Sequence, residues 1–130
     1  QEQISCCLKK KNIAEFDGLV GCIDVMLLWM EKPHKADCEV VGVGPEKFFC
    51  GRKKKFGLNM TATVDDQHRF IEVNISHPGA TSDYLAFSVS SFKRRLVSDL
   101  LLSSKYIFGD NAYVNTSYMA TPYRTPNIAK

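Results

Sequence analysis

Hydrophobic and polar residues follow strand-like patterns in the first half of the chain. Residues 18–29 are apolar at almost every position, which predicts a central strand covered on both faces. Residues 55–64 and 71–76 alternate between apolar and polar with a period of two, and the polar residues 65–68 between them suit a turn. We therefore expect the three strands to form an antiparallel meander.

The pattern then changes to that of a helix followed by a short strand. Thr81 or Ser82 can cap the helix, and its apolar residues fall on one stripe: Leu85, Val89, Phe92, Leu96 and Leu100. Residues 106–108 form a short apolar strand, for which the preceding helix favours a parallel crossover. Residues 115–130 have no strong period and predict a loop. The expected fold class is α/β, in the order strand, strand, strand, helix, strand.

Length and composition fit one domain. The chain has 130 residues, 45% of them hydrophobic, which is enough for one globular domain. Residues 1–17 are polar and predict a lead-in segment to a domain at 18–130, in which residues 31–54 mix Pro, Gly and charges and predict an irregular insertion. The longest apolar run contains Asp24 and is shorter than the roughly 18 residues of a membrane span, so no membrane partner is expected. The net charge of +3 is too small to identify a polyanionic partner.

The cysteines and the start of the chain add two expectations. Five cysteines, an odd number without Cys-x-x-Cys spacing, indicate neither a zinc ribbon nor a secreted disulfide framework, and they favour a reducing compartment. Because the first residue is Gln1 and no secretory leader precedes the apolar run, we expect an internal piece of a longer protein.

Two acidic residues stand where a carboxylate needs an explanation. Asp24 lies inside an apolar strand, where desolvation is costly unless the carboxyl group is protonated, bound to a metal or paired with a Lys or Arg. Asp110 follows the short strand at 106–108, and ligands of α/β sheets gather beyond such strand ends. Position alone favours an ordinary Asp-Asn turn for Asp110.

Together the two residues are more informative than either alone. If the last strand lies beside the first, their carboxylates belong to neighbouring strands about 5 Å apart. Mg²⁺ and Mn²⁺ favour such oxygen ligands, and two ions roughly 4 Å apart can activate an attacking oxygen and stabilise a leaving one in phosphodiester cleavage. The pattern therefore predicts a nuclease or strand-transfer site.

Other polar residues are open to two interpretations. Asp83 opens the predicted helix, where the dipole stabilises a carboxylate by about 0.3–1 kcal/mol, so position alone favours an ordinary role. His77 precedes Pro78 and is a weaker ligand candidate, since a lone His is more often structural. Four consecutive basic residues suit contact with phosphates, although charge runs are usually solvated faces: Arg52, Lys53, Lys54 and Lys55.

Five short blocks occur in order along the chain: GCID at 21–24, GRKKKFGLN at 51–59, HPGATSD at 77–83, GDNAY at 109–113 and TPYR at 121–124. Their order and spacing resemble Harbinger-type DDE transposases and the nucleases derived from them. The resemblance covers nearly the whole chain, from residue 16 to residue 127.

The resemblance implies an RNase H-like domain that cuts and joins DNA with a divalent metal, Mg²⁺ or Mn²⁺. By the matching blocks, Asp24 is its first carboxylate, Asp110 is the acid at the second strand end, and Asp83 is a further acidic position at the same metal centre. The implied activity of the full-length protein is phosphodiester hydrolysis and strand transfer. No specific DNA contact of the basic segment follows from the resemblance.

The resemblance also implies partners and a location. The expected partner is double-stranded DNA at transposon ends, with an accessory DNA-binding protein as a further partner, and the expected location is the nucleus. An oligomer is compatible with the resemblance but is not indicated by the sequence.

Two departures from the family limit what is expected. The family usually has a run such as Gly-Thr-His after the first Asp, whereas this chain has the bulkier Val25, Met26 and Leu27. The family's essential Glu lies on a helix after a further strand, and the chain ends before it. We therefore expect this fragment alone to be inactive, and we expect its truncation before the last strand and helix to leave residues 106–108 as an open sheet edge.

Two other functions stay open. One is a domesticated, catalytically inactive derivative that binds DNA or a protein, with Val25–Leu27 as its mark. The other is an unrelated α/β binding domain whose acidic residues are merely paired.

Overall fold

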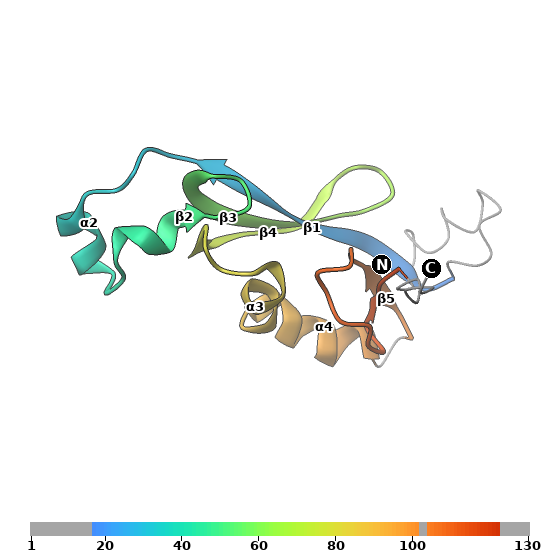
Figure 1. Cartoon of the computed structure of the whole chain (residues 1–130). Helices are drawn as coiled ribbons and strands as arrows, with labels where there is room; N and C mark the ends of the chain where they lie inside the picture. Colours follow the sequence, from blue (N-terminus) through green and yellow to red (C-terminus); the bar gives the residue numbers. More distant parts are fainter. Residues whose placement is uncertain (1–16, 102–103, 123–130) are drawn as a thin grey trace, which may run out of the picture.

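A mixed sheet forms the centre of the protein (Figure 1). The computed structural model describes residues 17–101 and 104–122, so most of the predicted lead-in segment lies outside the described residues. The strands are β1 (Leu19–Trp29), β2 (Phe49–Cys50), β3 (Lys55–Val64), β4 (Phe70–Pro78), β5 (Tyr106–Phe108) and β6 (Met119–Ala120). Antiparallel pairs join β1 to β3 and join β3 to both β2 and β4, whereas β1–β5 and β5–β6 are parallel. The predicted mixed α/β class is confirmed.

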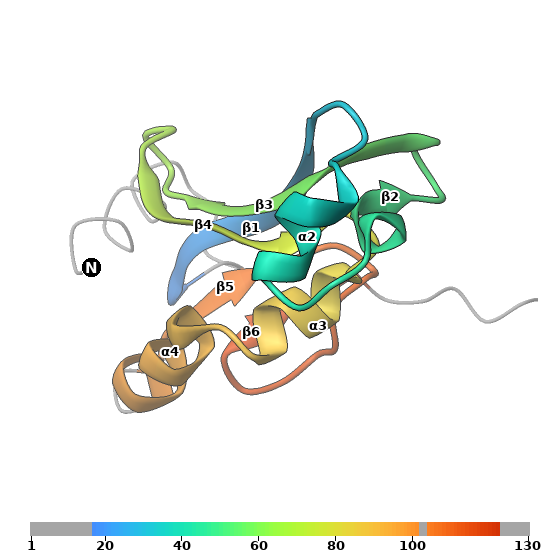
Figure 2. The same ribbon diagram turned by 90° about the vertical axis from the view of Figure 1, so that its left-hand side faces the viewer.

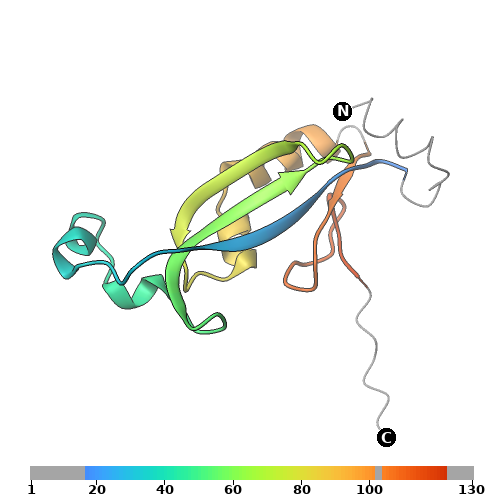
Figure 3. The same ribbon diagram turned by 90° about the horizontal axis from the view of Figure 1, so that it is seen from above.

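The helices are α2 (Lys35–Val40), the 3₁₀ helix η2 (Pro45–Phe48), α3 (Asp83–Ser88) and α4 (Ser91–Leu101), of which α3 and α4 cover one face of the sheet. Figure 2 shows α3 and α4 on the same side of β1, β3 and β4, while α2 and η2 lie toward the end of β1 that Figure 3 shows farthest from the chain termini. No helix in the described ranges is long and apolar enough to cross a membrane. The segment 31–54, expected to be irregular, thus contains α2, η2 and β2.

The core lies between the helices and the start of the sheet. Its buried members come from β1, α3, α4, β5, β6 and the turn after β5: Val20, Ile23, Phe87, Phe92, Leu96, Ile107, Tyr113 and Met119. An ion pair between Arg95 of α4 and Glu72 of β4 adds a polar link between helix and sheet. This core fixes α3 and the β5 end relative to β1, which is what positions the acidic residues.

The first strand is not covered on both faces along its whole length. Leu19, Val20 and Ile23 are buried, but Met26 is 53% exposed and Trp29 is 67% exposed. The prediction of a fully covered strand was therefore wrong for its second half. A run of apolar residues at both odd and even positions fits a strand with two covered faces. The same run also fits a strand that extends beyond the helices that cover it, so the sequence pattern cannot distinguish the two.

One predicted helix is in fact two. Ser90 interrupts it, because its hydroxyl donates to the Phe87 carbonyl at 2.7 Å and accepts the N–H of Lys93 at 3.0 Å. A serine that binds neighbouring backbone groups ends one helix and caps the next. As a result Leu85 and Val89, expected on the buried stripe, are 51% and 58% exposed.

The chain after β5 is not a loop throughout. Met119 and Ala120 form β6, which pairs with Ile107 and Phe108. A tight turn in which the N–H of Thr116 donates to the Met119 carbonyl at 2.8 Å brings this short strand back to the sheet. The predicted open edge at 106–108 was therefore wrong, because two residues with no visible alternation suffice to cover a three-residue strand.

The β3–β4 turn occupies the predicted positions 65–68 and depends on Asp65. Its carboxylate accepts the backbone N–H groups of Gln67 and Arg69, both at 2.9 Å, and the Arg69 side chain at 2.8 Å. These bonds lower the pKa of Asp65, the backbone N–H of Arg69 contributing most, although burial acts in the opposite direction. The turn is thus held by an ionised carboxylate.

We expect Asp65→Asn to destabilise the protein at neutral pH and to reduce the loss of stability in acid. A lowered folded-state pKa means that the unfolded chain binds more protons, so this stabilisation is complete above the unfolded pKa of about 3.9 and is lost as the pH falls through the folded value. Urea unfolding between pH 7 and pH 2 measures both effects. Equal pH dependence of the two proteins would contradict the assignment, and Asp37→Asn on α2 is the control.

Candidate functional site

The acidic site begins where β1 and β5 separate. The two parallel strands pair at Leu19 with Tyr106, Gly21 with Ile107 and Cys22 with Phe108. Asp24 and Asp110 each follow two residues after that last pair. The predicted parallel pairing of the last strand is therefore confirmed, and its partner is the first strand, so both acids lie at the same end of the strand pair.

Asp24 is exposed on β1, so the desolvation expected from its apolar neighbours does not arise. Its Oδ1 accepts the N–H of Val25 at 2.7 Å. Val25 lies on the stretch of β1 beyond the last β1–β5 pair, which joins Cys22 to Phe108. The ion pair considered for Asp24 is absent from the described part of the chain, where the pairs involve other carboxylates.

Asp110 sits in the turn that its position favoured. Its Oδ1 accepts the N–H of Ala112 at 2.9 Å, and its carbonyl accepts the N–H of Tyr113 at 3.2 Å. This turn ends β5 and directs the chain away from β1. The turn and a ligand role are compatible, because the turn fixes the direction of an exposed carboxylate.

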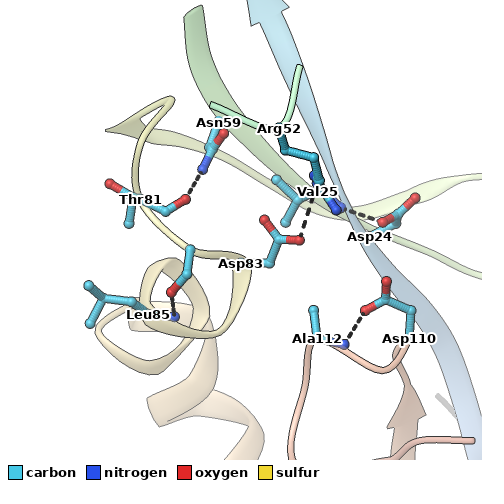
Figure 4. Close-up of polar contacts among 10 residues, drawn as sticks. Asp24, Val25, Arg52, Asn59, Thr81, Asp83, Leu85, Asp110 and Ala112 are labelled. Atoms are coloured by element: carbon cyan, nitrogen blue, oxygen red, sulfur yellow. Dashed lines mark hydrogen bonds and ion pairs between the residues drawn. The ribbon is translucent and has the colours of Figure 1, made fainter. Parts of the chain in front are cut away.

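Asp83 comes to the same place from the opposite side. Ser82 caps α3, as predicted, by accepting the N–H of Leu85 at 3.3 Å, which puts Asp83 in the first turn. Burial raises the pKa of Asp83, the Arg52 guanidinium opposes this, and the carboxylates of Asp110 and Asp24 raise it further. Figure 4 shows the three carboxylates arriving from β1, α3 and the turn after β5.

Arg52 supplies a positive charge at this acidic site. Its guanidinium lies 3.8 Å from Oδ2 of Asp83, whose side chain is only 16% exposed (Figure 4). Sequence reasoning placed Arg52 in a phosphate-binding cluster and did not connect it with an acid. The cluster in fact divides, since Lys55 lies over the ring of Trp29 with its Nζ 3.4 Å from the ring centroid.

Two residues near the acids were not identified from the sequence. Tyr113 is buried against Phe87, with ring centroids 5.7 Å apart, and its hydroxyl has no hydrogen-bond partner among the described residues. Burial and the charges of Asp83, Asp110 and Asp24 all raise the pKa of Tyr113, so its hydroxyl stays protonated. The GDNAY block contains Tyr113, but nothing in its spacing indicates that the ring packs against Phe87 within reach of the charges of the acids.

Asn59 is the second residue that the sequence did not identify. It is buried on β3, and its side-chain amide donates to the Thr81 carbonyl at 2.6 Å (Figure 4). This bond ties the loop before α3 to the sheet and so fixes the position of Asp83. Its signal in the sequence is a polar residue at a buried position of an alternating strand. The nearby His77 pairs with Asn59 across β3 and β4.

A pocket of about 360 Å³ opens beside Asp83. It is walled by the turn before β3, by the loop before α3 and by β1, with these polar or charged residues among its lining: Arg52, Lys53, Asn59, Thr81, Ser82 and Asp83. The pocket therefore presents cations and a carboxylate to the same space.

The donor groups suit a hard divalent cation, but they do not enclose one as they stand. In residues 17–101 and 104–122, no three His, Cys, Asp or Glu side chains are close enough together to hold an ion. Burial is the main cause of the raised pKa of Asp83, and the carboxylates of Asp110 and Asp24 raise it further, an effect that a bound cation would oppose. Carboxylate oxygens are also the ligands that Mg²⁺ and Mn²⁺ prefer.

Comparison with known proteins adds a family and one relative. The sequence model of the family described as DDE superfamily endonuclease matches residues 23–129. The chain is also 27% identical over 129 residues to an Arabidopsis thaliana protein described as "Protein ALP1-like", a match that covers 89% of this chain. The chain spans about 30% of the length of that relative. No solved structure matches the chain significantly.

Proposed function

Because the chain belongs to the DDE superfamily endonuclease family, we propose that it forms part of the RNase H-like catalytic core of a metal-dependent DNA nuclease or transposase. The reaction proposed for the full-length protein is phosphodiester hydrolysis followed by strand transfer. The order of the paired strands and the helices on one face support this core.

The observation that carries the proposal is the approach of three acids from distant segments toward the same end of the β1–β5 pair. Asp24 and Asp110 follow the last pair of two parallel strands, and the charges of both act on Asp83. Neighbouring carboxylates repel each other, and a cation between them would relieve this repulsion. Their oxygens are therefore the proposed ligands of Mg²⁺ or Mn²⁺.

The residues of the acidic site have separate roles in the proposed reaction. When bound, the metal supplies Lewis acidity to the scissile phosphate and to the attacking oxygen. Asp24 and Asp110 are proposed to hold it from the two strands, and Asp83 to complete the set from α3. Arg52, whose guanidinium lies 3.8 Å from the Asp83 carboxylate, would be suited to contact a phosphate oxygen of the substrate.

The setting of the reaction is also proposed. We propose double-stranded DNA at transposon ends as substrate, an accessory DNA-binding protein as partner, and the nucleus as location. The charge arrangement supports a phosphate-rich substrate, since Arg52 and Lys53 line the pocket beside Asp83.

In a second candidate function, the protein has the same fold but does not cleave DNA. In a domesticated derivative, the chain would bind DNA or a protein but cut nothing. The ion pair between Arg52 and Asp83 favours it, because the protein then supplies its own cation to the acidic site. The bulky Val25 and Leu27 line the pocket and point to the same function.

Thermal melting with added metal tests the proposal. We expect Mg²⁺ or Mn²⁺ to raise the Tm of the wild-type chain, because a ligand at 100 times its Kd stabilises the folded state by about 2.7 kcal/mol. Asp24→Asn should lose most of this shift, since an amide is a poor ligand for a hard cation. Asp37→Asn, on an exposed position of α2, should keep it.

Two results would count against the metal site. An equal Tm shift in wild type and Asp24→Asn would remove Asp24 from the ligand set. No shift in the wild-type chain at millimolar metal would favour the inactive derivative instead.

A further inference from the structure

A groove leads away from the acidic site along β1. It is lined by the six consecutive residues from Asp24 to Trp29, with Lys53 on its other wall. Among the described residues no strand pairs with one edge of β1 along this stretch, because β5 pairs with β1 only as far as Cys22. Six residues of extended strand span about 17 Å. That distance matches about five nucleotides of a stacked DNA strand.

The far end of this groove is aromatic and basic. Trp29 is 67% exposed, although large aromatic rings are normally mostly buried. The Lys55 Nζ lies 3.4 Å from the centroid of its ring. A second hollow adjoins Trp29, and its charged lining residues are Glu31, Lys32, Lys54 and Lys55. The groove therefore runs from carboxylates at one end to an exposed ring surrounded by lysines at the other.

We propose that an unpaired DNA strand occupies this groove, with one base stacked on Trp29 and its phosphates against Lys53, Lys54 and Lys55. This deepens the proposed function, on which it rests, by specifying that the substrate is single-stranded next to the acidic site. A base can stack on a protein ring only when its own face is free, as in a frayed end or an overhang. Lys55 then moves from the Trp29 face to a phosphate of the same strand.

The position of the lysines favours a nucleic-acid strand over an apolar partner. Four lysines line the groove and the adjoining hollow, whereas Glu31 is the one acid in the lining outside the acidic site. Positively charged grooves with interspersed aromatic rings track a phosphate backbone and stack its bases. The turn before β3 joins the two ends, since Arg52 contacts Asp83 and Lys55 contacts Trp29.

Tryptophan fluorescence shows whether the groove is occupied, because Trp29 is the single Trp of the chain. We expect an eight-nucleotide oligo(dT) to quench Trp29 fluorescence in EDTA, where no metal is bound and no cleavage occurs. A hairpin duplex with an eight-nucleotide overhang should quench equally well. The same hairpin with a blunt end should bind at least tenfold more weakly.

Substitutions assign the contacts, with binding measured by anisotropy of a labelled oligo(dT). Trp29→Ala should weaken binding by between about five- and 150-fold, the range for loss of one stacked base, and Trp29→Phe should restore most of it. Phe70→Ala is the matched control, since Phe70 is 66% exposed at the opposite end of the sheet. Lys53→Met should lower the slope of log K against log salt by about 0.7, and Arg94→Met on α4 should not.

Three outcomes would overturn the inference: equal binding of blunt and overhanging duplex, an equal loss in Trp29→Ala and Phe70→Ala, or tighter binding of the matching RNA oligonucleotide. Because these measurements are made in EDTA, they are independent of the metal titration. If metal does not raise the Tm but the DNA strand still binds, the proposed nuclease function is overturned and the proposed strand-binding groove stands. If metal raises the Tm but the strand does not bind, the nuclease proposal stands and the groove proposal is overturned.

Discussion

Full-length protein carrying Asp110→Asn should lose DNA cleavage by about 10³-fold or more while binding DNA as tightly as wild type. A metal ligand contributes several kcal/mol to stabilising the transition state, and about 4 kcal/mol corresponds to three powers of ten in rate. The substitution preserves the local structure, because the Asn side-chain carbonyl can still accept the N–H of Ala112 in the same turn. The loss therefore reports on charge and not on folding.

Cleavage of a labelled transposon-end duplex and a parallel binding assay measure the two quantities separately. Asn111→Ala, in the same exposed turn, controls for disturbance of the backbone and should cut normally. Undiminished cleavage by Asp110→Asn would refute its role. Binding without any cleavage by the wild-type protein, under conditions where the metal is bound, would instead identify the domesticated derivative.

Phe87→Ala should destabilise the protein by about 3–5 kcal/mol, the usual cost of deleting a large ring from a packed core. Phe87 is 4% exposed and contacts the ring of Tyr113 edge-on, so it joins α3 to the turn after β5. Urea unfolding at pH 7 measures the change. The predicted loss is a large fraction of the 5–15 kcal/mol that holds a typical domain together.

Leu85→Ala on the same helix is the matched control and should cost less than about 1 kcal/mol, because Leu85 is 51% exposed. The continuous helix expected from the sequence would have made Leu85 the buried position. A larger effect at Leu85 than at Phe87 would therefore contradict the break at Ser90 and restore the single helix.

Much of the sheet could be predicted because its longer strands have a local pattern of apolar and polar residues. The alternation at 55–64 and 71–76 and the turn between them appear in the structure nearly as expected. The parallel direction of β5 followed from the preceding helix, but its place beside β1 was only a condition of the sequence argument. The pairing seen in the structure brings Asp24 and Asp110 to the same end of the two strands, whereas their proposed roles stay predictions until metal binding is measured.

What the sequence did not show depends on contacts between distant segments. The buried side of α3 is set by Ser90 and by packing against Tyr113, neither of which alters the apolar spacing. β6 has two residues, too few for any periodicity. The attraction between Arg52 and Asp83 joins residues far apart in the chain, so Arg52 looked like one more member of a basic run.

Arg52 also gives the acidic site a cation that is part of the chain. Its guanidinium keeps its charge at any pH the protein meets, so it attracts Asp83 whether or not an ion is present. We therefore expect the fold not to depend on a dissolved ion, and the protein should remain folded through purification in chelator.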